Sequence, residues 1–556
     1  MTTEKSPEEG SKSPEEGPKS PEEAQNGDPK GAARMVSGRR LIQSTSIVSG
    51  MTLLSRILGL ARDMVFARFF ATSLVMDAFL VANRIPNMLR RFFAEGAFSQ
   101  GFVPVMAQYR EKHSHAETRD FVDAVAGTFG LILFGITLLG VIAAPVLVAI
   151  VAPGFIGDDG RFELASMMLR FTFPYLLFVS LTAFAGGVLN TYGRFAVPAL
   201  TPVILNVVLI AAAIWWAPAL EEPGMALAYG VFVAGVLQLM FQIPFLIQIR
   251  AMPRPKWRIA HSGVRRVMTL MLPAIFGSSV AQINLLVGGI IASMLGVGKI
   301  SLLYYSDRLM EFPLGLFGIA LATVTLPYLS RQYANESHDE FSATIDWSMK
   351  LVLLIAVPAA IGLIMLAEPL VATIFYGGNF TDDDVRLTAL ALQAFSVGLV
   401  GFSYVKILAP AYFARQDTRT PVKFGLVALG VNFVLSVTLA WYLTSIGYAG
   451  NHAGLALAIS IAALLNAYLL YRGLRRDGVV THSAGWRNLG LQVVAANGAM
   501  WVILDQLSRP LAWWIDAGLW DRAGWLTVSI AAAAGMYFLV LLSLGFRSAD
   551  LGMRPR

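Results

Sequence analysis

The chain has 556 residues, of which 56% are hydrophobic and only 14% are charged, and its mean hydropathy is +0.61. A soluble globular protein carries roughly 25% charged residues, so this composition excludes an ordinary soluble protein and predicts a polytopic membrane protein. The net charge of +7 does not indicate a nucleic-acid-binding protein, because the basic residues concentrate in short loops between apolar segments, and the absence of cysteine excludes disulfides and thiolate metal sites.

The first 35 residues form a polar tail that repeats a seven-residue unit three times. Each unit contains the run Lys-Ser-Pro-Glu-Glu, which begins at Lys5, Lys12 and Lys19. A proline in every unit and the lack of an apolar seam argue against a coiled coil, so we predict that residues 1–35 are disordered. Because this beginning is polar and acidic, we expect no cleavable signal peptide.

Apolar windows long enough to cross a membrane, about 20 residues each, follow the tail. They lie near residues 44–70, 73–103, 124–152, 164–190, 196–217, 223–249, 266–295, 301–330, 346–375, 385–414, 420–444, 449–473, 486–507 and 524–545. We therefore predict an all-α polytopic membrane protein with 14 transmembrane helices. The expected units are an N-terminal lobe at 36–258, a C-terminal lobe at 259–478, each with six helices, and two further helices with a C-terminal tail at 479–556.

The loops between these windows alternate in charge. Lys and Arg cluster in one set, near 110–119, 250–266, 415–423 and 472–487, whereas the other set contains few basic residues and includes an acidic run at 382–384. Since basic residues favour the cytoplasmic side of a membrane, we expect both termini to be cytoplasmic.

The two series of six windows show a weak internal repeat. Asn83-Arg84 is echoed by Asp307-Arg308 at an offset of 308 − 84 = 224, Asn206 by Asn432 at 226, and Pro104 by Pro327 at 223. Six helices per copy give both copies the same orientation, so we predict two lobes that are related by an axis along the membrane normal and enclose a central cavity.

Charged residues inside the predicted helices point to a site in this cavity, because each costs roughly 2.5 to 3.5 kcal/mol near the bilayer centre. On the second helix the spacing places Asp77, Arg84, Arg91 and Glu95 along one face, with Asn87 beside it. Basic side chains are in excess, and the planar guanidinium suits a diphosphate, so we predict an anionic ligand.

Each candidate residue was chosen for its charge or polarity within a predicted span. The candidate substrate-binding residues are Arg56, Arg62, Arg84, Arg308 and Asn87, and the candidate charge-pairing or gating residues are Asp63, Asp77, Arg90, Arg91, Glu95, Asp307, Glu311 and Lys406. We expect Asp63 and Asp77 to pair with the arginines when the cavity is empty. The alternative is that Arg62 only locks two helices together, and that Arg90 and Arg91 reach the membrane surface and bind nothing.

Four motifs around these residues resemble those of one family. They are SRILGLARD (55–63), MDAF (76–79), PNMLRRFFAEGAFSQ (86–100) and YYSDRLMEFP (304–313). The chain resembles the MurJ (MviN) lipid II flippases of the multidrug/oligosaccharidyl-lipid/polysaccharide exporter superfamily over roughly residues 39–546, and the acidic repeat has no counterpart in that family.

The resemblance implies a transporter that moves the lipid-linked peptidoglycan precursor from the inner to the outer leaflet of the bacterial inner membrane, by alternating access. It implies no bond chemistry, hence no enzyme and no cofactor. Among the candidates it marks Arg56, Arg62, Asp77 and Arg308 as essential cavity positions, and it assigns the last two helices to a groove for the polyprenyl tail. Lipid II, membrane lipids and cell-wall synthesis enzymes are the expected partners, with no nucleic acid.

Some family members resemble sodium-coupled carriers with acidic ligands on the seventh and eleventh helices. The corresponding positions here read Asn284, Asn432 and Ser436, without carboxylates, which argues against a sodium site. Two other functions stay open: export of another lipid-linked saccharide or of cationic drugs, and a scaffold that recruits cell-wall enzymes without transport. The surplus of intramembrane arginine argues against both the drug exporter and the scaffold.

Overall fold

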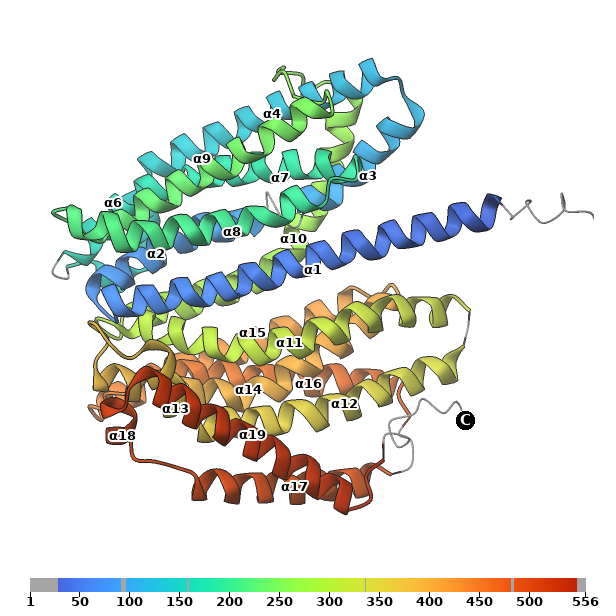
Figure 1. Ribbon diagram of the computed structural model, residues 1–556. Helices are drawn as coiled ribbons and strands as arrows, with labels where there is room; N and C mark the ends of the chain where they lie inside the picture. Colours follow the sequence, from blue (N-terminus) through green and yellow to red (C-terminus); the bar gives the residue numbers. More distant parts are fainter. Residues whose placement is uncertain (1–28, 92–96, 158–159, 336, 482–484, 548–556) are drawn as a thin grey trace, which may run out of the picture.

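The computed structural model describes residues 29–91, 97–157, 160–335, 337–481 and 485–547, which fold into helices (Figure 1). The first nine are α1 (Pro29–Phe70), α2 (Leu74–Arg90), α3 (Ala97–Lys112), α4 (His115–Ile142), α5 (Ala144–Val151), α6 (Arg161–Thr172), α7 (Tyr175–Thr191), α8 (Ala196–Ala211) and α9 (Met225–Gln248). They are followed by α10 (Ser262–Ser293), α11 (Lys299–Ala334), α12 (His338–Met365), α13 (Ala367–Phe375), α14 (Asp382–Ala414), α15 (Arg419–Ser445), α16 (Ala453–Arg476), α17 (Trp486–Gln506), α18 (Leu511–Asp516) and α19 (Leu519–Ser543).

These helices confirm the prediction of an all-α polytopic membrane protein. Within the described residues, nine helices are long and apolar enough to cross a membrane. The helices are consistent with the 14 predicted spans if α2 and α3, α4 and α5, α6 and α7, and α12 and α13 each form one span, and if the six-residue α18 belongs to a loop. Capping boxes at Ser114 and Thr381 fix the first turns of α4 and α14, because each side chain bonds to a backbone N–H that the helix leaves free.

The helices gather in two groups, one of α1 to α9, in which α1 packs on α8, and one of α11 to α19, with α10 between them (Figure 1). In the first group α8 packs on α1 and α9, and α2 packs on α6; in the second, α14 is central and contacts α11, α12 and α16. Helix α10 packs against α3 and α4 as well as α11 and α15. It therefore bridges the two groups, although the sequence predicts that it belongs to the C-terminal lobe.

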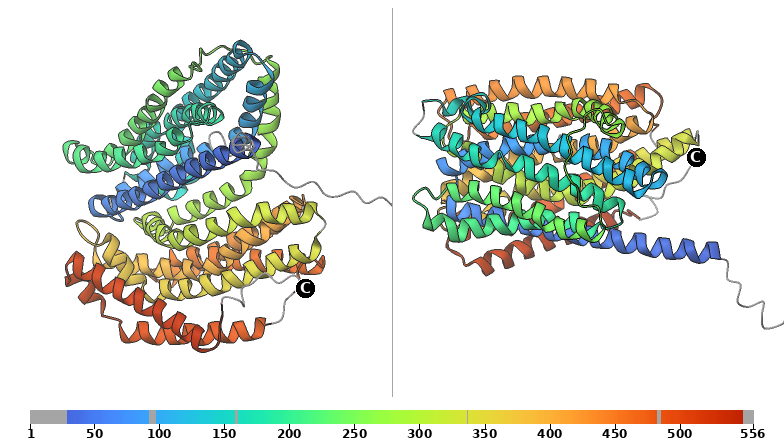
Figure 2. Two further views of the ribbon diagram at one scale, coloured as in Figure 1. Left: turned by 45° about the vertical axis from the view of Figure 1, so that its right-hand side comes forward. Right: turned by 90° about the horizontal axis from the view of Figure 1, so that it is seen from above.

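The two groups are joined at the end of the bundle opposite the first turn of α1. There Asn379 donates from its backbone N–H to the carbonyl oxygen of Arg68 (2.9 Å) and from its side chain to that of Phe69 (2.7 Å). The hydroxyl of Tyr305 donates to the carbonyl of Ala71 over 3.2 Å. From this end, which we call the closed end, the groups diverge toward the end where α1 begins (Figures 1 and 2).

The beginning of α1 differs from the prediction. The helix starts at Pro29, inside the segment 1–35 that was predicted to be disordered, and it projects beyond the other helices (Figure 2). The acidic repeat itself lies outside the described residues.

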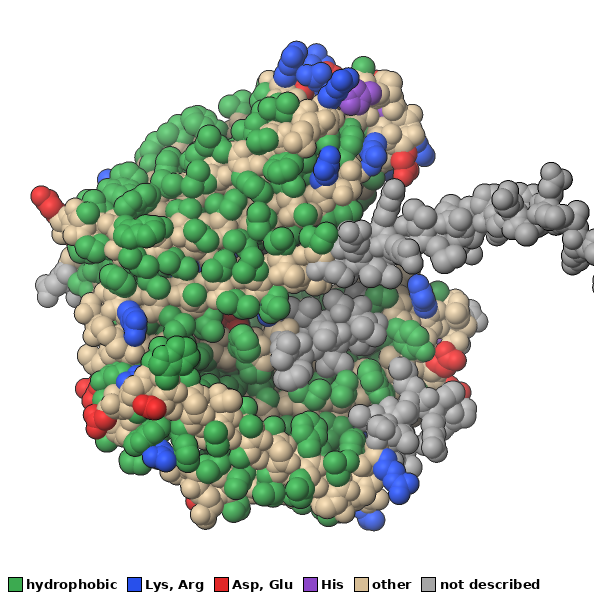
Figure 3. Space-filling view, in the orientation of Figure 1, with side chains coloured by type: hydrophobic (Ala, Val, Ile, Leu, Met, Phe, Trp, Pro, Cys, Tyr) green, Lys and Arg blue, Asp and Glu red, His purple; other side chains and the backbone are tan. Residues whose placement is uncertain are grey.

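The surface is that of a membrane protein. Hydrophobic side chains cover the face drawn in Figure 3, and charged side chains gather toward its two ends. Among the exposed residues are Leu139 and Val494, as well as Trp215 and Trp441, which occupy matching positions of the repeat (441 − 215 = 226). An apolar belt between charged ends fits a protein that is surrounded by lipid at its middle.

Candidate functional site

Three of the predicted arginines lie at a similar depth from the closed end. Arg62 precedes the last residue of α1 by eight positions, Arg84 follows the first residue of α2 by ten, and Arg308 follows the first residue of α11 by nine. At 1.5 Å per residue, these positions are about 12 to 15 Å from their helix ends. All three helices face the region between the two groups, which is hollowed in Figure 3 and contains charged side chains.

A single carboxylate joins Arg62 to Arg308 across the two groups. Arg62 donates to Oδ1 of Asp63 from Nη2 (2.7 Å) and Nε (3.0 Å), and Nε of Arg308 lies 3.3 Å from Oδ2 of the same residue. Arg308 also bonds to Glu311 over 3.0 Å. The side chain of Asp63 is 2% exposed, whereas those of Arg308 and Glu311 are 40% and 52% exposed. The structure thus brings together two predicted substrate-binding residues around one buried acid.

Two uncharged residues complete this cluster and were not assigned by the sequence. Tyr304 donates to Oδ1 of Asp63 (2.7 Å) and accepts from Nη2 of Arg62 (3.1 Å), and its ring lies 5.2 Å from the guanidinium carbon of Arg308. Asn206 of α8 accepts from Nη1 of Arg62 (3.1 Å) and donates to the carbonyl of Ser55 (3.0 Å). In the sequence, Asn206 stands out only through the internal repeat, and Tyr304 only through the motif at 304–313.

We expect Tyr304→Phe to destabilise the empty protein, because the hydroxyl bonds to a buried carboxylate. A hydrogen bond to a charged group contributes about 1.5 to 3 kcal/mol. The thermal melting temperature of the purified protein should therefore fall, while Tyr468→Phe, a control at a residue that is 55% exposed, should leave it unchanged. Equal melting temperatures for Tyr304→Phe and the unaltered protein would contradict this role.

Arg56 and Lys406 lie beside the cluster. The guanidinium of Arg56 lies against Gly315 of α11. A Cβ atom added at Gly315 would overlap with Nη1 of Arg56. Lys406 of α14 is within electrostatic range of Arg56 and Glu311. Lys406 is therefore in range of the acid that pairs with Arg308, and Arg56 adds further positive charge nearby on the Lys406 side.

Arg84 occupies a separate position on the neighbouring helix. Its guanidinium lies against Gly289 of α10, and Nη1 is buried without a hydrogen-bond partner among the described residues. Asp307 and Asp77 are the acids within electrostatic range. A buried donor without a partner costs about 1 to 3 kcal/mol, or more when it is charged, so an acceptor for Nη1 of Arg84 would stabilise the protein.

Asp77 does not pair with the cavity arginines as predicted. Its carboxylate accepts from the backbone N–H of Gly298 (2.6 Å), and from both the backbone N–H (2.9 Å) and hydroxyl (2.6 Å) of Ser301. The nearest cation is Arg161, at 3.8 Å. The physical reason is that the first turn of α11 leaves its N–H groups free and carries a partial positive charge, which stabilises an acid there. These hydrogen bonds between Asp77 of α2 and the start of α11 hold the two groups together at the closed end, and we call them the Asp77 clasp.

The remaining candidates of the second helix lie toward its other end. Nε of Arg90 donates to Oδ1 of Asn87 over 3.3 Å, and the side chain of Arg91 is exposed. Glu95 lies outside the described residues. The predicted stripe is thus divided: Asp77 is at the closed end, Arg84 is at the depth of the Asp63 cluster, and Arg91 is nearly two turns further along.

The three positions that correspond to sodium ligands in some family members carry uncharged side chains here. Ser436 donates to the side-chain oxygen of Asn432 over 3.3 Å, and both residues are buried in α15. The side chain of Asn284 lies outside the described part of the structure. Two neutral oxygens are a poor match for a dedicated cation site.

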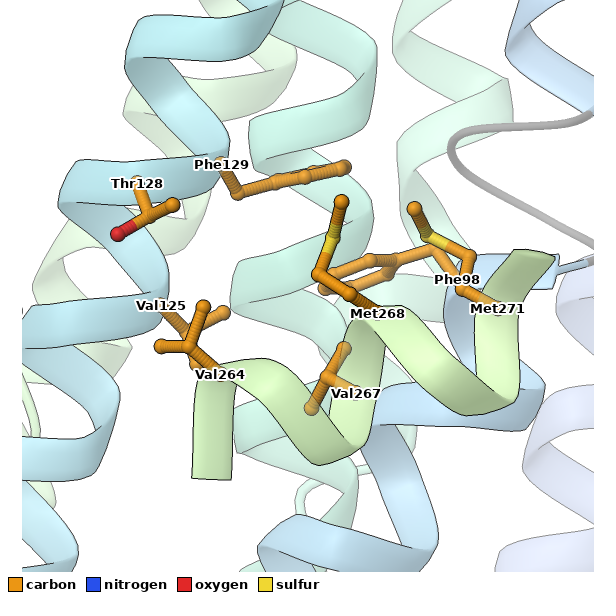
Figure 4. Close-up of a pocket in the computed structure, with 8 residues that line it drawn as sticks. All are labelled: Phe98, Val125, Thr128, Phe129, Val264, Val267, Met268 and Met271. Carbon is orange, nitrogen blue, oxygen red and sulfur yellow. The ribbon is translucent and has the colours of Figure 1, made fainter. Parts of the chain in front are cut away.

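A small hollow between α3, α4 and α10 has a different character. It is lined by Phe98, Val125, Thr128, Phe129, Val264, Val267, Met268 and Met271 (Figure 4). Thr128 is the one polar residue of this lining, and none of the lining residues is charged. The hollow therefore cannot recognise an anion, and the candidate site is the cluster around Asp63.

Comparison with known proteins gives one consistent match. The family model described as Lipid II flippase MurJ matches residues 66–514. The "Probable lipid II flippase MurJ" of Vibrio cholerae is 45% identical over 92% of this chain and 98% of its own length, and that of Haemophilus influenzae is 44% identical over 90% and 99%. The "Lipid II flippase MurJ" of Burkholderia cenocepacia is 42% identical over 93% and 100%.

Solved structures agree with this match. The chain resembles "Lipid II flippase MurJ, inward closed conformation" with a TM-score of 0.73 and 26% identity, over 89% of this chain and 97% of that one. It also resembles the inward-facing conformation of a multidrug resistance MATE family transporter, with a TM-score of 0.62, over 78% of this chain and 98% of that one. At 15% identity, the second likeness shows the fold alone.

Proposed function

The chain belongs to the lipid II flippase MurJ family, and from this premise we propose that it carries lipid II from the inner to the outer leaflet of the bacterial inner membrane. The observation that carries the proposal is the Asp63 cluster, where two arginines of different helix groups share one buried acid. The step moves a lipid and makes or breaks no bond, and it supplies the precursor for peptidoglycan synthesis and hence for cell shape.

We infer that the end where α1 begins is cytoplasmic, and that both termini lie there. The support is the concentration of Lys and Arg in the loops of that end, near 110–119, 250–266, 415–423 and 472–487. The closed end is then the outer one, so the cavity opens toward the side on which lipid II is made.

The cluster offers a way to exchange an internal anion for an external one. In the empty protein, Asp63 partly neutralises Arg62 and Arg308, which keeps two guanidiniums stable at membrane depth. A diphosphate can bind both arginines through bidentate, charge-assisted hydrogen bonds, and it then displaces Asp63 from them. Arg56 and Asn87 are the further candidates for contact with the headgroup, and Lys406 and Glu311 for pairing around it.

Helix α11 provides a link between this exchange and the closed end. It carries both Arg308 and Ser301, which are seven residues, or about two turns, apart. Ser301 is held by Asp77, so a shift of α11 upon headgroup binding acts directly on the Asp77 clasp. Release of the clasp, with closure of the inner end, is the alternating-access step in this proposal.

The lobes at 36–258 and 259–478 are the moving bodies of the proposal, and the segment 479–556 with α17 and α19 provides the groove for the polyprenyl tail. The pair α17 and α19 is fixed to α12 and α13 at three places: Trp486 donates to Asp346 (2.6 Å), Tyr537 to the carbonyl of Leu354 (2.8 Å) and Arg522 to that of Ala372 (3.2 Å). These bonds support a groove that moves with α12 and α13. Membrane lipids and cell-wall synthesis enzymes are the other partners that we propose.

Reconstitution tests the function directly. Liposomes that contain the purified full chain and fluorescent lipid II should expose the label to an external reagent faster than empty liposomes do. Transport of cationic drugs in place of lipid II would support the drug antiporter, and no transport of any lipid-linked saccharide would support the scaffold. Depletion in cells separates them further, because loss of a flippase stops growth while inner-leaflet precursor accumulates.

A further inference from the structure

Arg84 reaches across from α2 to α10, and a glycine makes this possible. A Cβ atom added at Gly289 would overlap with Nη1 of Arg84 and lie 2.8 Å from its guanidinium carbon. At the preceding position, Gly288, an added Cβ would meet nothing within 4 Å. Gly289 is buried and forms a cradle that fits the guanidinium, and a side chain at this position would have to displace Arg84.

The contact of Arg84 can be compared with that of Arg308, which occupies the matching position of the repeat (308 − 84 = 224). Arg308 of α11 reaches over to Asp63 of α1, and Arg84 of α2 reaches over to Gly289 of α10. Both arginines therefore contact a neighbouring helix, but only Arg308 meets a carboxylate there.

Two acids lie within electrostatic range of Arg84, but each also has other partners. Asp77 is within electrostatic range, but it is already held by three hydrogen bonds from the first turn of α11. Asp307 is also in range, but it is shared with Arg308 and Arg91. Nη1 of Arg84 has no hydrogen-bond partner in the described part of the chain.

We propose that Arg84, cradled by Gly289, forms a second anion subsite that binds one phosphate group of a diphosphate-linked lipid before Asp63 releases Arg62 and Arg308. The proposal rests on the proposed function and adds an order to it. Arg84 captures the diphosphate first, because its Nη1 has no hydrogen-bonded acid that would have to leave. The Asp63 cluster follows, since its arginines become free only when an anion competes with Asp63.

The test compares one added carboxylate at two adjacent positions. Gly289→Asp displaces the guanidinium of Arg84 from its cradle and adds an acid beside it, whereas Gly288→Asp adds the same charge to the same helix where there is open space. The affinity of the purified full chain for lipid II should fall about tenfold or more in Gly289→Asp, since a charge-assisted hydrogen bond is lost. Gly288→Asp should bind lipid II within about twofold of the unaltered chain. Equal affinities of the two variants would overturn the subsite.

A second variant distinguishes the loss of lipid II binding from misfolding of the protein. Arg84→Met removes the charge and keeps a long side chain, and it should weaken lipid II binding to the same extent as Gly289→Asp at an unchanged melting temperature. If both variants bind lipid II normally while Arg62→Ala does not, the subsite is wrong and the proposed function stands. If Arg62→Ala also binds lipid II normally, the proposed function fails with it.

Discussion

Arg62→Ala is expected to abolish lipid II translocation in liposomes. Arg62 makes two hydrogen bonds to Asp63 and one each to Asn206 and Tyr304, so no other residue of the cluster replaces it. Removal of one partner of a buried ion pair costs roughly 3 to 5 kcal/mol. If that loss falls on the loaded state, the translocation rate drops by about a hundredfold or more.

The matched control keeps the positive charge at position 62 but removes the planar guanidinium group. Arg62→Lys retains a cation but cannot form the fork that binds two oxygens at once, so we expect an intermediate translocation rate. Arg308→Ala should behave like Arg62→Ala, because it removes the other partner of Asp63. Normal translocation by either alanine variant, at ordinary protein abundance, would show that these arginines only lock helices together.

The second large effect is expected for Asp77→Asn. The amide oxygen of asparagine is uncharged and accepts fewer bonds than the carboxylate, which receives three from Gly298 and Ser301. Loss of charge-assisted hydrogen bonds worth about 1.5 to 3 kcal/mol each, together with the favourable charge at the start of α11, should open the closed end. A change of about 3 kcal/mol shifts the population of the open state by more than a hundredfold.

Because the chain contains no cysteine, spin labels can report this opening at two introduced sites. Ile156 and Tyr448 are exposed residues in loops of the two groups at the closed end, so the distance between labels at Ile156→Cys and Tyr448→Cys should lengthen in Asp77→Asn. The control is Asp123→Asn, since Asp123 is another buried acid that accepts a backbone N–H, from Arg254, but lies near the other end. An unchanged distance in Asp77→Asn would remove Asp77 from the gate.

Much of the fold could be predicted because membrane spans follow from local composition. An apolar window of sufficient length is helical wherever it occurs, since the bilayer leaves backbone groups no partner outside the helix. The positions of Arg62 and Arg308 could be predicted for the same reason: a charge within such a window is costly and needs a cavity. Their shared contact with Asp63 also fits the expected pairing in the empty protein.

The partners of the other residues could not be predicted in the same way. Helical spacing placed Asp77 and Arg84 on one face of α2, but it does not say which neighbour covers each level of that face. Asp77 meets the first turn of α11, whereas Arg84, two turns away, meets Gly289 of α10. Asn206 is 144 residues from Arg62 in the chain, so its contact depends on the packing of α8 against α1, which no local pattern encodes.

The affinity of Asp63→Asn for lipid II tests the central claim most directly. If Asp63 competes with the diphosphate for Arg62 and Arg308, its neutralisation should strengthen lipid II binding by about tenfold, because the anion no longer displaces an acid. Translocation should nevertheless fall, since the arginines lose the partner to which they return when the lipid leaves. Weaker or unchanged binding of lipid II by Asp63→Asn would contradict the account.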